Sequence, residues 1–574
     1  MGKRKKYIII GLIILMVLLA AWKLLMVTVF KSYAGASGER KEEPILAVYD
    51  YNGQLKSNNL NGFKHVFIRW NDNKEEDAAK LLSPALINHQ PVLITVEIWP
   101  SSANKIFANK NILSLVADGF FDAKIKTLCD YLSKQQQPVL IRFAPEMEVY
   151  VNRYPWQMQS SELYIKAFRH FAELCKKNAP TTKMVWAPAG YPGTEEYWPG
   201  ASWVDMISVT LRGKSELMTN NYPEPTSQAI LIKRKIIRTR FFEKPIIVLG
   251  SEKLTAADFK QPSFDSAVQE INENKALLYK DANAAEQEKN DSLLRKEGSL
   301  IVGVYDPKSA IVNNPLLSVE HLFVNLESLR DGSFKKNFDS VVERNHDVIV
   351  TMEPWREKGL EKDPQLISNI LSGHYDDRFK QLFSIITGTK RTVYLRWLHE
   401  MEIPITRYPW QSQDPIAYIK AFRYFVNKLQ PKPSNIFIVW GPAGDRGSIE
   451  FWPGSDVVDY ISIAIYGLPD KNITDHNKQE SFNTIFRRKY NRLRFAHKPL
   501  FITEFGVKGP QDYKKKWLQD AAVVINQHPE IIGINYFNFA DSPKAWGNIE
   551  TPDWSTTPEV FANFLKQLHT GSIK

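Results

Sequence analysis

The chain has 574 residues, which is too many for one hydrophobic core, so several domains are expected. Apolar residues make up 44% of the chain and aromatic residues 12%, which excludes a disordered protein. The net charge of +11 does not indicate a nucleic-acid partner, because the remaining +5 (11 − 6) forms no basic stripe once six N-terminal residues are set aside. These six are Lys3, Arg4, Lys5, Lys6, Lys23 and Lys31.

The N-terminus carries a candidate membrane anchor at residues 1–31. An apolar run from Tyr7 to Trp22, continued by Leu24 to Phe30, is about long enough to cross ~30 Å of hydrocarbon. The basic cluster before it predicts a cytoplasmic N-terminus, with the rest of the chain outside the membrane. A cleaved signal peptide is the alternative, since residues 34–36 (AGA) form a small-residue cleavage pattern.

After a polar linker at 32–44, the sequence repeats itself. Residues 142–156 match residues 396–410 at 8 of 15 positions, with an offset of 254 (396 − 142). The same offset relates Tyr164 to Tyr418 and Trp186 to Trp440. We interpret the chain as a tandem duplication of two units, 45–284 and 299–574, joined by a second polar linker at 285–298.

The second unit contains eight short apolar runs, most of them separated by segments with helical periodicity. Apolar runs that alternate with helices over ~270 residues are typical of a parallel (β/α)8 barrel. The expected fold class is therefore α/β, with two tandem (β/α)8 TIM-type barrels after an N-terminal transmembrane helix. The eight runs are 300–305, 321–326, 347–352, 392–397, 435–440, 459–465, 499–503 and 531–537.

Two carboxylates close barrel strands on the face where barrel enzymes carry their active sites. Glu400 ends the fourth strand and Glu504 ends the seventh, so they are expected to face each other across the barrel mouth. Retaining glycosidases need such a pair, one carboxylate as nucleophile and one as acid/base. Arg396 is expected to point at the same site, Tyr466 to hydrogen-bond Glu504, and His399 to help order the pair.

Aromatic residues at the other strand ends complete the predicted site. Trp355 follows the third strand, Trp440 ends the fifth and Tyr536 lies at the end of the eighth, and we predict that all three bind substrate. Neither a metal nor a cofactor is expected. Cys129 and Cys175 lack zinc-site spacing, and two buried small residues are favoured over a disulfide.

The second unit resembles glycoside hydrolase family 26, a β-mannanase-like family of clan A. The resemblance covers 300–565 and rests on RWLHEM (396–401), YPW (408–410), VWGPAG (439–444) and ITEFG (502–506). It implies Glu400 as acid/base, Glu504 as nucleophile, His399 and Tyr466 as residues that hold the nucleophile, and Trp440 as a wall residue. The segment after Glu400 departs from the family, since Glu402 stands where mannanases usually have Asn.

The first unit lacks several of these groups. At the offset of 254, Pro145 stands for His399, Arg212 for Tyr466 and Gly250 for Glu504, although Glu146 matches Glu400. Without a nucleophile the double displacement fails, so this unit is predicted to be degenerate and non-catalytic.

The functional prediction is an envelope-located retaining endo-β-glycosidase. Its substrate would be a β-linked polysaccharide: a mannan, a β-glucan or an exopolysaccharide. Transglycosylation would use the same residues. The alternative is a protein that binds polysaccharide, or helps to assemble or secrete exopolysaccharide, without cutting it.

Overall fold

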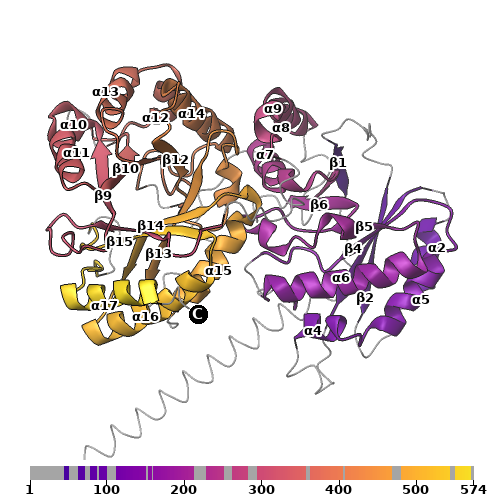
Figure 1. Cartoon of the computed structure of the whole chain (residues 1–574). Helices are drawn as coiled ribbons and strands as arrows, with labels where there is room; N and C mark the ends of the chain where they lie inside the picture. The colour runs from indigo at the N-terminus through magenta and orange to yellow at the C-terminus, as the bar shows by residue number, and fades with distance from the viewer. Residues whose placement is uncertain are drawn as a thin grey trace, which may run out of the picture.

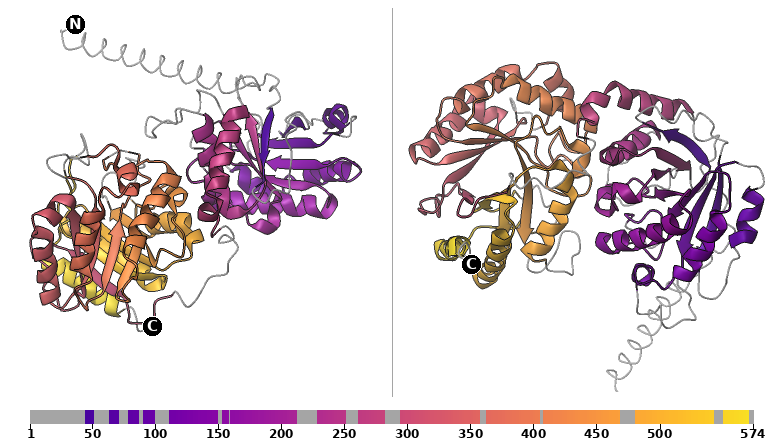
Figure 2. Two further views of the ribbon diagram at one scale, coloured as in Figure 1. Left: turned by 90° about the horizontal axis from the view of Figure 1, so that it is seen from above. Right: turned by 45° about the vertical axis from the view of Figure 1, so that its right-hand side comes forward.

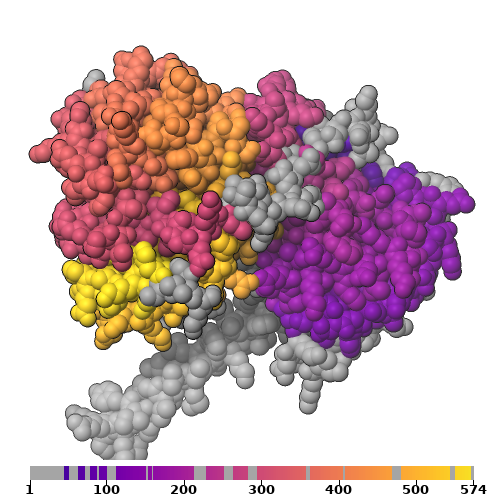
Figure 3. Space-filling model, in the orientation of Figure 1, coloured from indigo at the N-terminus to yellow at the C-terminus, as the bar shows by residue number. Residues whose placement is uncertain are grey.

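The computed structural model describes two α/β units that lie side by side (Figures 1 and 3). No helix within the described ranges is long and apolar enough to cross a membrane. The predicted anchor at 1–31 lies outside the described residues. The structure describes residues 44–50, 63–70, 78–86, 90–99, 111–149, 153–157, 159–211, 228–250, 261–281, 294–356, 362–404, 407–467, 480–542 and 550–570.

The C-terminal unit is a closed barrel of eight parallel strands, as the sequence predicts. Each strand pairs with the next along the chain, and the last strand pairs with the first. All eight predicted apolar runs correspond to these strands. The strands are β8 (Ile301–Tyr305), β9 (Val319–Asn325), β10 (Asp347–Glu353), β11 (Val393–Trp397), β12 (Ile436–Trp440), β13 (Tyr460–Gly467), β14 (Leu500–Val507) and β15 (Ile531–Phe537).

Alternation along these strands divides the core of the C-terminal unit into two layers. Successive side chains of a strand point to opposite faces. One set, which includes Val439 and Phe501, fills the barrel interior. The other set packs outward against the helices. These are α10 (Leu326–Arg330), α11 (Ser333–Glu343), α12 (Leu366–Leu371), α13 (Asp376–Ile386), α14 (Pro415–Lys428), η7 (Ser448–Phe451), α15 (Phe482–Leu493), η8 (Arg494–Ala496), α16 (Gln511–Gln527) and α17 (Pro558–Thr570).

The N-terminal unit is not the closed barrel that the sequence predicts. Its seven strands form an open sheet in the order β1-β7-β6-β5-β4-β3-β2, and Figure 2 shows this sheet beside the barrel. The first strand runs antiparallel to β7 and lies at the edge of the sheet. The strands are β1 (Ile45–Tyr49), β2 (Lys64–Trp70), β3 (Val92–Ile98), β4 (Val139–Phe143), β5 (Lys183–Trp186), β6 (Met206–Leu211) and β7 (Ile246–Gly250).

The segment 276–281, which follows β7 in the chain, supplies no eighth strand, because it is half helix and half turn. It overlaps α9, where Leu278 packs into the outer core. Without an eighth parallel strand, nothing in the described sheet joins β7 back to β2, and the sheet stays open. The helices of this unit are α2 (Ala78–Leu86), α4 (Ile112–Ala117), α5 (Asp122–Leu132), α6 (Ser161–Asn178), η1 (Thr194–Tyr197), η2 (Ala201–Trp203), α7 (Gln228–Thr239), η4 (Arg240–Phe242), α8 (Gln261–Glu273) and α9 (Lys275–Leu278).

Candidate active site

Glu504 of β14 is held by two side chains, one from the adjacent strand β13 and one from β11, which is not adjacent to β14. Arg396 of β11, which is fully buried, forms an ion pair with Oε1 of Glu504. Tyr466 of β13 donates a hydrogen bond of 2.9 Å to Oε2, as the sequence predicts. Burial alone would raise the pKa of Glu504, but the charge of Arg396 outweighs it, and the pKa falls to about 2. Glu504 is therefore an anion at neutral pH.

A bulge in β14 turns Glu504 toward the barrel interior. The pairing with β13 shifts between Ser462 and Ala464, so that Ala464 lies opposite Glu504. Asn535 of β15 supports this irregular segment, because its side-chain amide donates to the carbonyl of Thr503 at 3.0 Å. An extra residue in one strand re-aims the side chains that follow it. The bulge thus places the carboxylate beside Arg396.

Glu400 lies just beyond the end of β11 in a left-handed backbone conformation. Its φ is +53°, and its amide donates to the carbonyl of Gly441 at 2.8 Å. Such a conformation is strained for a residue other than glycine and is common at active sites. Removal from water, together with the nearby charge of Glu504, raises the pKa of Glu400 to about 8. Near pH 7, Glu400 is therefore protonated and neutral, whereas Glu504 is ionised.

His399 lies beside a third carboxylate that the sequence did not single out. Its Nε2 is 3.7 Å from Oε1 of Glu353, at the end of β10. Burial lowers the pKa of His399 well below its ordinary value, so the imidazole is neutral at pH 7. Burial also raises the pKa of Glu353 to about 7. We therefore conclude that Arg396 and Tyr466 are the residues that bind Glu504. The polar neighbour of His399 is Glu353.

Trp355 is part of an aromatic wall next to Glu353. Its indole nitrogen donates to Glu353 at 3.0 Å, and its ring meets that of Tyr408 at 4.8 Å. Tyr408 in turn stacks on Trp410, which is fully buried. Trp355 therefore lies beside Glu353, but its side chain is buried, and its contact with substrate stays a prediction.

A second aromatic group was missed by sequence reasoning. Tyr305, Phe323 and Phe537 come from β8, β9 and β15 and are all half-buried. The ring of Tyr305 lies 5.1 Å from Phe323 and 4.6 Å from Phe537. Phe537 also approaches the ring of Tyr466. Half-exposed rings beside paired carboxylates offer apolar faces to a sugar, and their position on the interior face of the strands is the signal that could have found them.

Trp440 and Tyr536, in contrast, are turned away from the predicted site. Trp440 packs against Trp452 in the outer layer, with ring centroids 5.1 Å apart, and is fully buried. Tyr536 packs against Phe505 and donates from its hydroxyl to the carbonyl of Trp554. Both side chains have the outward parity of their strands, so the structure gives them packing roles in place of the predicted substrate contacts.

The N-terminal unit keeps the strand frame but lacks this constellation among its described residues. Arg142, the counterpart of Arg396, donates to the hydroxyl groups of Ser208 at 3.0 Å and Thr210 at 3.2 Å. Strand β7 pairs with β6 in regular register up to Gly250, without a bulge. A side chain at Gly250 would meet Leu46 of the outer core. The position is therefore wrong for a nucleophile in direction as well as in residue type.

Within the described ranges, no group of three or more His, Cys, Asp or Glu residues is placed to hold a metal ion.

No family model matches the chain. Endoglucanase H of Acetivibrio thermocellus is 25% identical over 292 residues, which cover 47% of this chain and 30% of that protein. A β-1,3-xylanase of an Alcaligenes species is 26% identical over 236 residues, covering 39% of this chain and 45% of that protein. The chain spans less than half the length of these relatives. The sequence relatives are therefore endoglucanase- and xylanase-type glycoside hydrolases.

Solved structures that match part of the chain include a double mutant of the Cellulomonas fimi endo-β-1,4-mannanase. It is 14% identical, with a TM-score of 0.35, and the match covers 50% of this chain and 72% of that one. The structure of GH26C from a Muricauda species is 12% identical with a TM-score of 0.35, and the match covers 47% of this chain and 86% of that one.

The space that Arg396 occupies yields a first prediction. A methyl group at Gly441 would lie 2.3 Å from Nε of Arg396. We expect Gly441→Ala to displace the guanidinium from Glu504 and to lower the free energy of unfolding by about 1–3 kcal/mol, the usual cost of overpacking. Denaturant titration of the full chain measures this.

The N-terminal unit supplies the matched control, because Ala187 occupies the position that corresponds to Gly441 (441 − 254). Ala187→Gly should cost less than about 1 kcal/mol, since it removes only one methyl group and adds backbone freedom. Equal stability of Gly441→Ala and the parent would mean that Gly441 does not make room for Arg396.

Proposed function

We propose that the chain is a retaining endo-β-glycosidase that cleaves a β-linked polysaccharide at the cell envelope. The observation that carries the proposal is the pair of carboxyl groups at the strand ends: Glu504 is held by Arg396 and Tyr466, and Glu400 lies near enough for the charge of Glu504 to raise its pKa. A double displacement needs one carboxylate that is ionised and one carboxyl group that keeps its proton near neutral pH. The glycoside hydrolases among the sequence relatives support the same reaction class.

In the proposed reaction, Oε of Glu504 attacks the anomeric carbon while Glu400 protonates the oxygen of the leaving sugar. A glycosyl ester forms on Glu504 and the glycosidic bond breaks. Glu400, now an anion, then removes a proton from water, which attacks the anomeric carbon and frees Glu504. A sugar hydroxyl in place of that water would give transglycosylation with the same residues.

The substrate class follows from the walls of the site. Tyr305, Phe323 and Phe537, which are half-buried, provide ring faces for pyranose rings, whereas Trp355 is buried and its ring is covered by the guanidinium of Arg356. Glu402 is directed elsewhere, since its Oε1 accepts hydrogen bonds from the amides of Gly444 and Asp445. The position that carries Asn in mannanases is therefore occupied by a residue that holds a loop, and we do not restrict the substrate to mannan.

Two further parts of the proposal concern the rest of the chain. We propose that the segment 1–31 anchors the protein in the cytoplasmic membrane, with both units outside. We also propose that the N-terminal unit is non-catalytic, which is supported by the lack of a bulge in β7 and by the hydroxyl partners of Arg142.

Substitution of the nucleophile tests the proposal directly. The chain without the candidate anchor (residues 32–574) is incubated with mannans, mixed-linkage glucans, xylans and bacterial exopolysaccharides, and new reducing ends are measured. Glu504→Ala should lower turnover by at least about a thousandfold, because no glycosyl ester can form. The matched control Glu146→Ala, at the position in the N-terminal unit that corresponds to Glu400, should leave turnover unchanged.

If Glu504→Ala cuts as fast as the parent, the nucleophile is misassigned. If no glycan is cut but several are bound, the alternative of a non-hydrolytic binding or exopolysaccharide-assembly protein replaces this proposal.

The charge states predict the pH dependence of the reaction. Glu400 must be protonated, so activity should be lost as the pH rises through about 8, the pKa that burial gives this group. Glu504 must be ionised, so its low pKa leaves activity intact down to the pH at which the protein unfolds. A profile of kcat/KM that rises from pH 6 to pH 9 would contradict these assignments.

A further inference from the structure

The two units meet through contacts that repeat around a local two-fold axis. Arg238 of α7 donates to Glu450 of η7 at 2.5 Å, and Arg492 of α15 donates to Glu196 of η1 at 2.8 Å. Each pair becomes the other when 254 is added to the residue of the N-terminal unit and subtracted from that of the C-terminal unit (238 + 254 = 492 and 450 − 254 = 196). The contact is thus isologous, like that of a two-fold symmetric dimer.

A second pair of contacts follows the same rule. Arg240 donates to the carbonyl of Ile449 at 3.1 Å, and Arg494 donates to the carbonyl of Glu195 at 2.9 Å. Arg240 is buried and Arg494 half-buried, and burial lowers the pKa of each. Charged groups are buried only where partners compensate for the lost water. The interface is therefore a specific one, and its register is fixed by paired charges.

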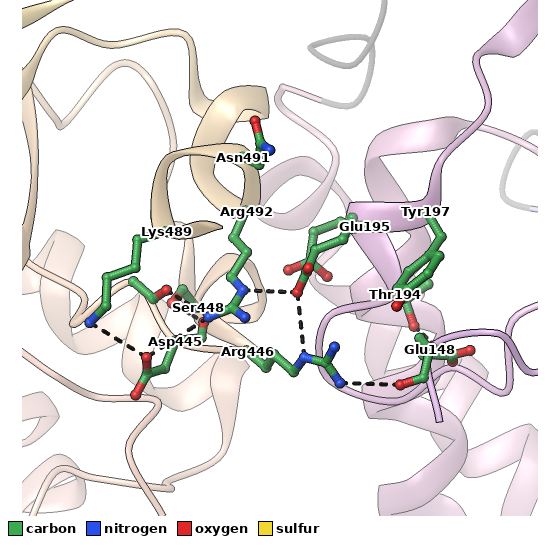
Figure 4. A network of polar contacts seen from close by, with 12 residues as sticks. Glu148, Thr194, Glu195, Tyr197, Asp445, Arg446, Ser448, Lys489, Asn491 and Arg492 are labelled. Carbon is green, nitrogen blue, oxygen red and sulfur yellow. Dashed lines mark hydrogen bonds and ion pairs between the residues drawn. The ribbon is translucent and has the colours of Figure 1, made fainter. Parts of the chain in front are cut away.

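On the side of the C-terminal unit, this interface holds a loop at 441–448. Figure 4 shows Arg446 of this loop directed at the N-terminal unit, where it donates to the carbonyl of Glu148 at 3.2 Å and lies 3.4 Å from Glu196. Arg492, bound to the same Glu196, also donates to the carbonyl of Gly444 at 3.1 Å. One carboxylate of the N-terminal unit thus fixes the loop from two sides.

The same loop binds the segment that carries the proposed acid. Glu402 accepts from the amides of Gly444 at 2.9 Å and Asp445 at 3.0 Å, and from the hydroxyl of Ser448 at 2.7 Å. Two residues earlier, the amide of Glu400 donates to the carbonyl of Gly441, the first residue of the loop. Hydrogen bonds, joined by short stretches of backbone, therefore connect Glu196 to Glu400.

We propose that the N-terminal unit serves as a positioning domain for the glycosidase proposed above. Its Glu196 holds the loop 441–448, and this loop holds the acid segment 400–402. Glu196 is a positioning residue, because it acts through Arg446 and Arg492 and does not itself approach the site. This inference rests on the proposed function for its catalytic consequence and on the contacts alone for its structural one.

Glu196→Gln in the full chain tests the proposal, with Glu450→Gln as the matched control. Each substitution removes a carboxylate that binds two arginines across the same interface, but Glu450 binds Arg234 and Arg238 of the N-terminal unit. Glu196→Gln should lower kcat about tenfold at nearly constant KM, since small misplacements of a catalytic group are costly. Glu450→Gln should leave kcat within about twofold of the parent.

Two readouts separate positioning from mere destabilisation. Loosening of 400–402 admits water to Glu400, so Glu196→Gln should move the alkaline limb of kcat/KM to lower pH. The charged groups that face Glu400 (Glu504, Arg396, Arg407 and Glu402) are unchanged in both variants. Amide hydrogen exchange should become faster at 398–404 and 441–448 in Glu196→Gln, and at 187–194 in Glu450→Gln.

Equal losses of kcat in the two variants, or unchanged exchange at 398–404 in Glu196→Gln, would overturn the proposal. If the parent cleaves no glycan, the exchange experiment still decides the positioning, whereas the proposed function fails by itself.

A separate observation concerns the two cysteines of the chain. Cys129 of α5 and Cys175 of α6 are both buried, and their sulfur atoms lie 2.7 Å apart. A disulfide bond is about 2.05 Å long, so a small shift of the two side chains would close it. Both cysteines are free thiols in the structure, in agreement with the sequence expectation. From their contact we infer that oxidation joins them in a disulfide between α5 and α6.

The oxidation removes two protons and two electrons from the pair, and a protein or glutathione disulfide accepts them to become two thiols. The bond joins residues 46 positions apart. Such a link restricts the unfolded chain and stabilises the fold.

Mass spectrometry after alkylation of the denatured full chain tests this. After purification in buffer with oxidised glutathione, neither cysteine should be alkylated unless a reductant is added first, and reduction should lower the Tm by about 10 °C. Cys129→Ser should show the reduced Tm under both conditions. Complete alkylation of both cysteines without reductant would overturn the inference.

Discussion

The ion pair between Arg396 and Glu504 is the constraint on which the candidate site depends. A guanidinium group that is fully buried is unfavourable unless a carboxylate compensates its charge. Three local features meet this need. Gly441 leaves space for the guanidinium, the bulge of β14 turns Glu504 inward, and Tyr466 satisfies the second carboxylate oxygen. The negative charge fixed in this way helps to keep Glu400 protonated.

The N-terminal unit has a similar arrangement of strands but lacks a counterpart of the ion pair between Arg396 and Glu504 among its described residues. Its segment around Glu146 keeps the left-handed backbone, with a φ of +61°, and the amide of Glu146 donates to the carbonyl of Ala187 as that of Glu400 does to Gly441. Glu148 accepts amide hydrogen bonds from its loop, as Glu402 does. These features therefore belong to the fold and the interface that the two units share, and in the C-terminal unit they also hold the acid segment. The ion pair, in contrast, belongs to the proposed chemistry alone.

Much of the C-terminal unit could be predicted from its sequence, because buried parallel strands give strong apolar runs and barrel sites lie at strand ends. Arg396, Glu400, Tyr466 and Glu504 were found in this way. The prediction that Trp440 and Tyr536 face the site was wrong. Successive residues of a strand point alternately to the site and to the helices, so a shift of one residue in the pairing reverses the face. The bulge of β14 reverses it for Glu504, and no residue pattern indicates that bulge.

Other features depend on distant contacts that a single sequence does not contain. In the open sheet of the N-terminal unit, β1 pairs antiparallel with β7, a pairing that the apolar pattern of β1 does not indicate. The role of Glu402, which is to bind the loop 441–448, depends on contacts with residues more than 40 positions away in the sequence. The contact of Cys129 with Cys175 likewise depends on how α5 packs against α6.

The most direct test of the central claim is to trap the covalent intermediate. A 2-deoxy-2-fluoro glycoside of the sugar that the enzyme cleaves is incubated with the protein, and the labelled peptide is identified by mass spectrometry. The ionised state of Glu504 predicts a single glycosyl ester on that residue, and none in Glu504→Ala. A label on Glu353 or Glu400, or unlabelled protein that is nevertheless inactivated, would contradict the assignment of Glu504 as the nucleophile.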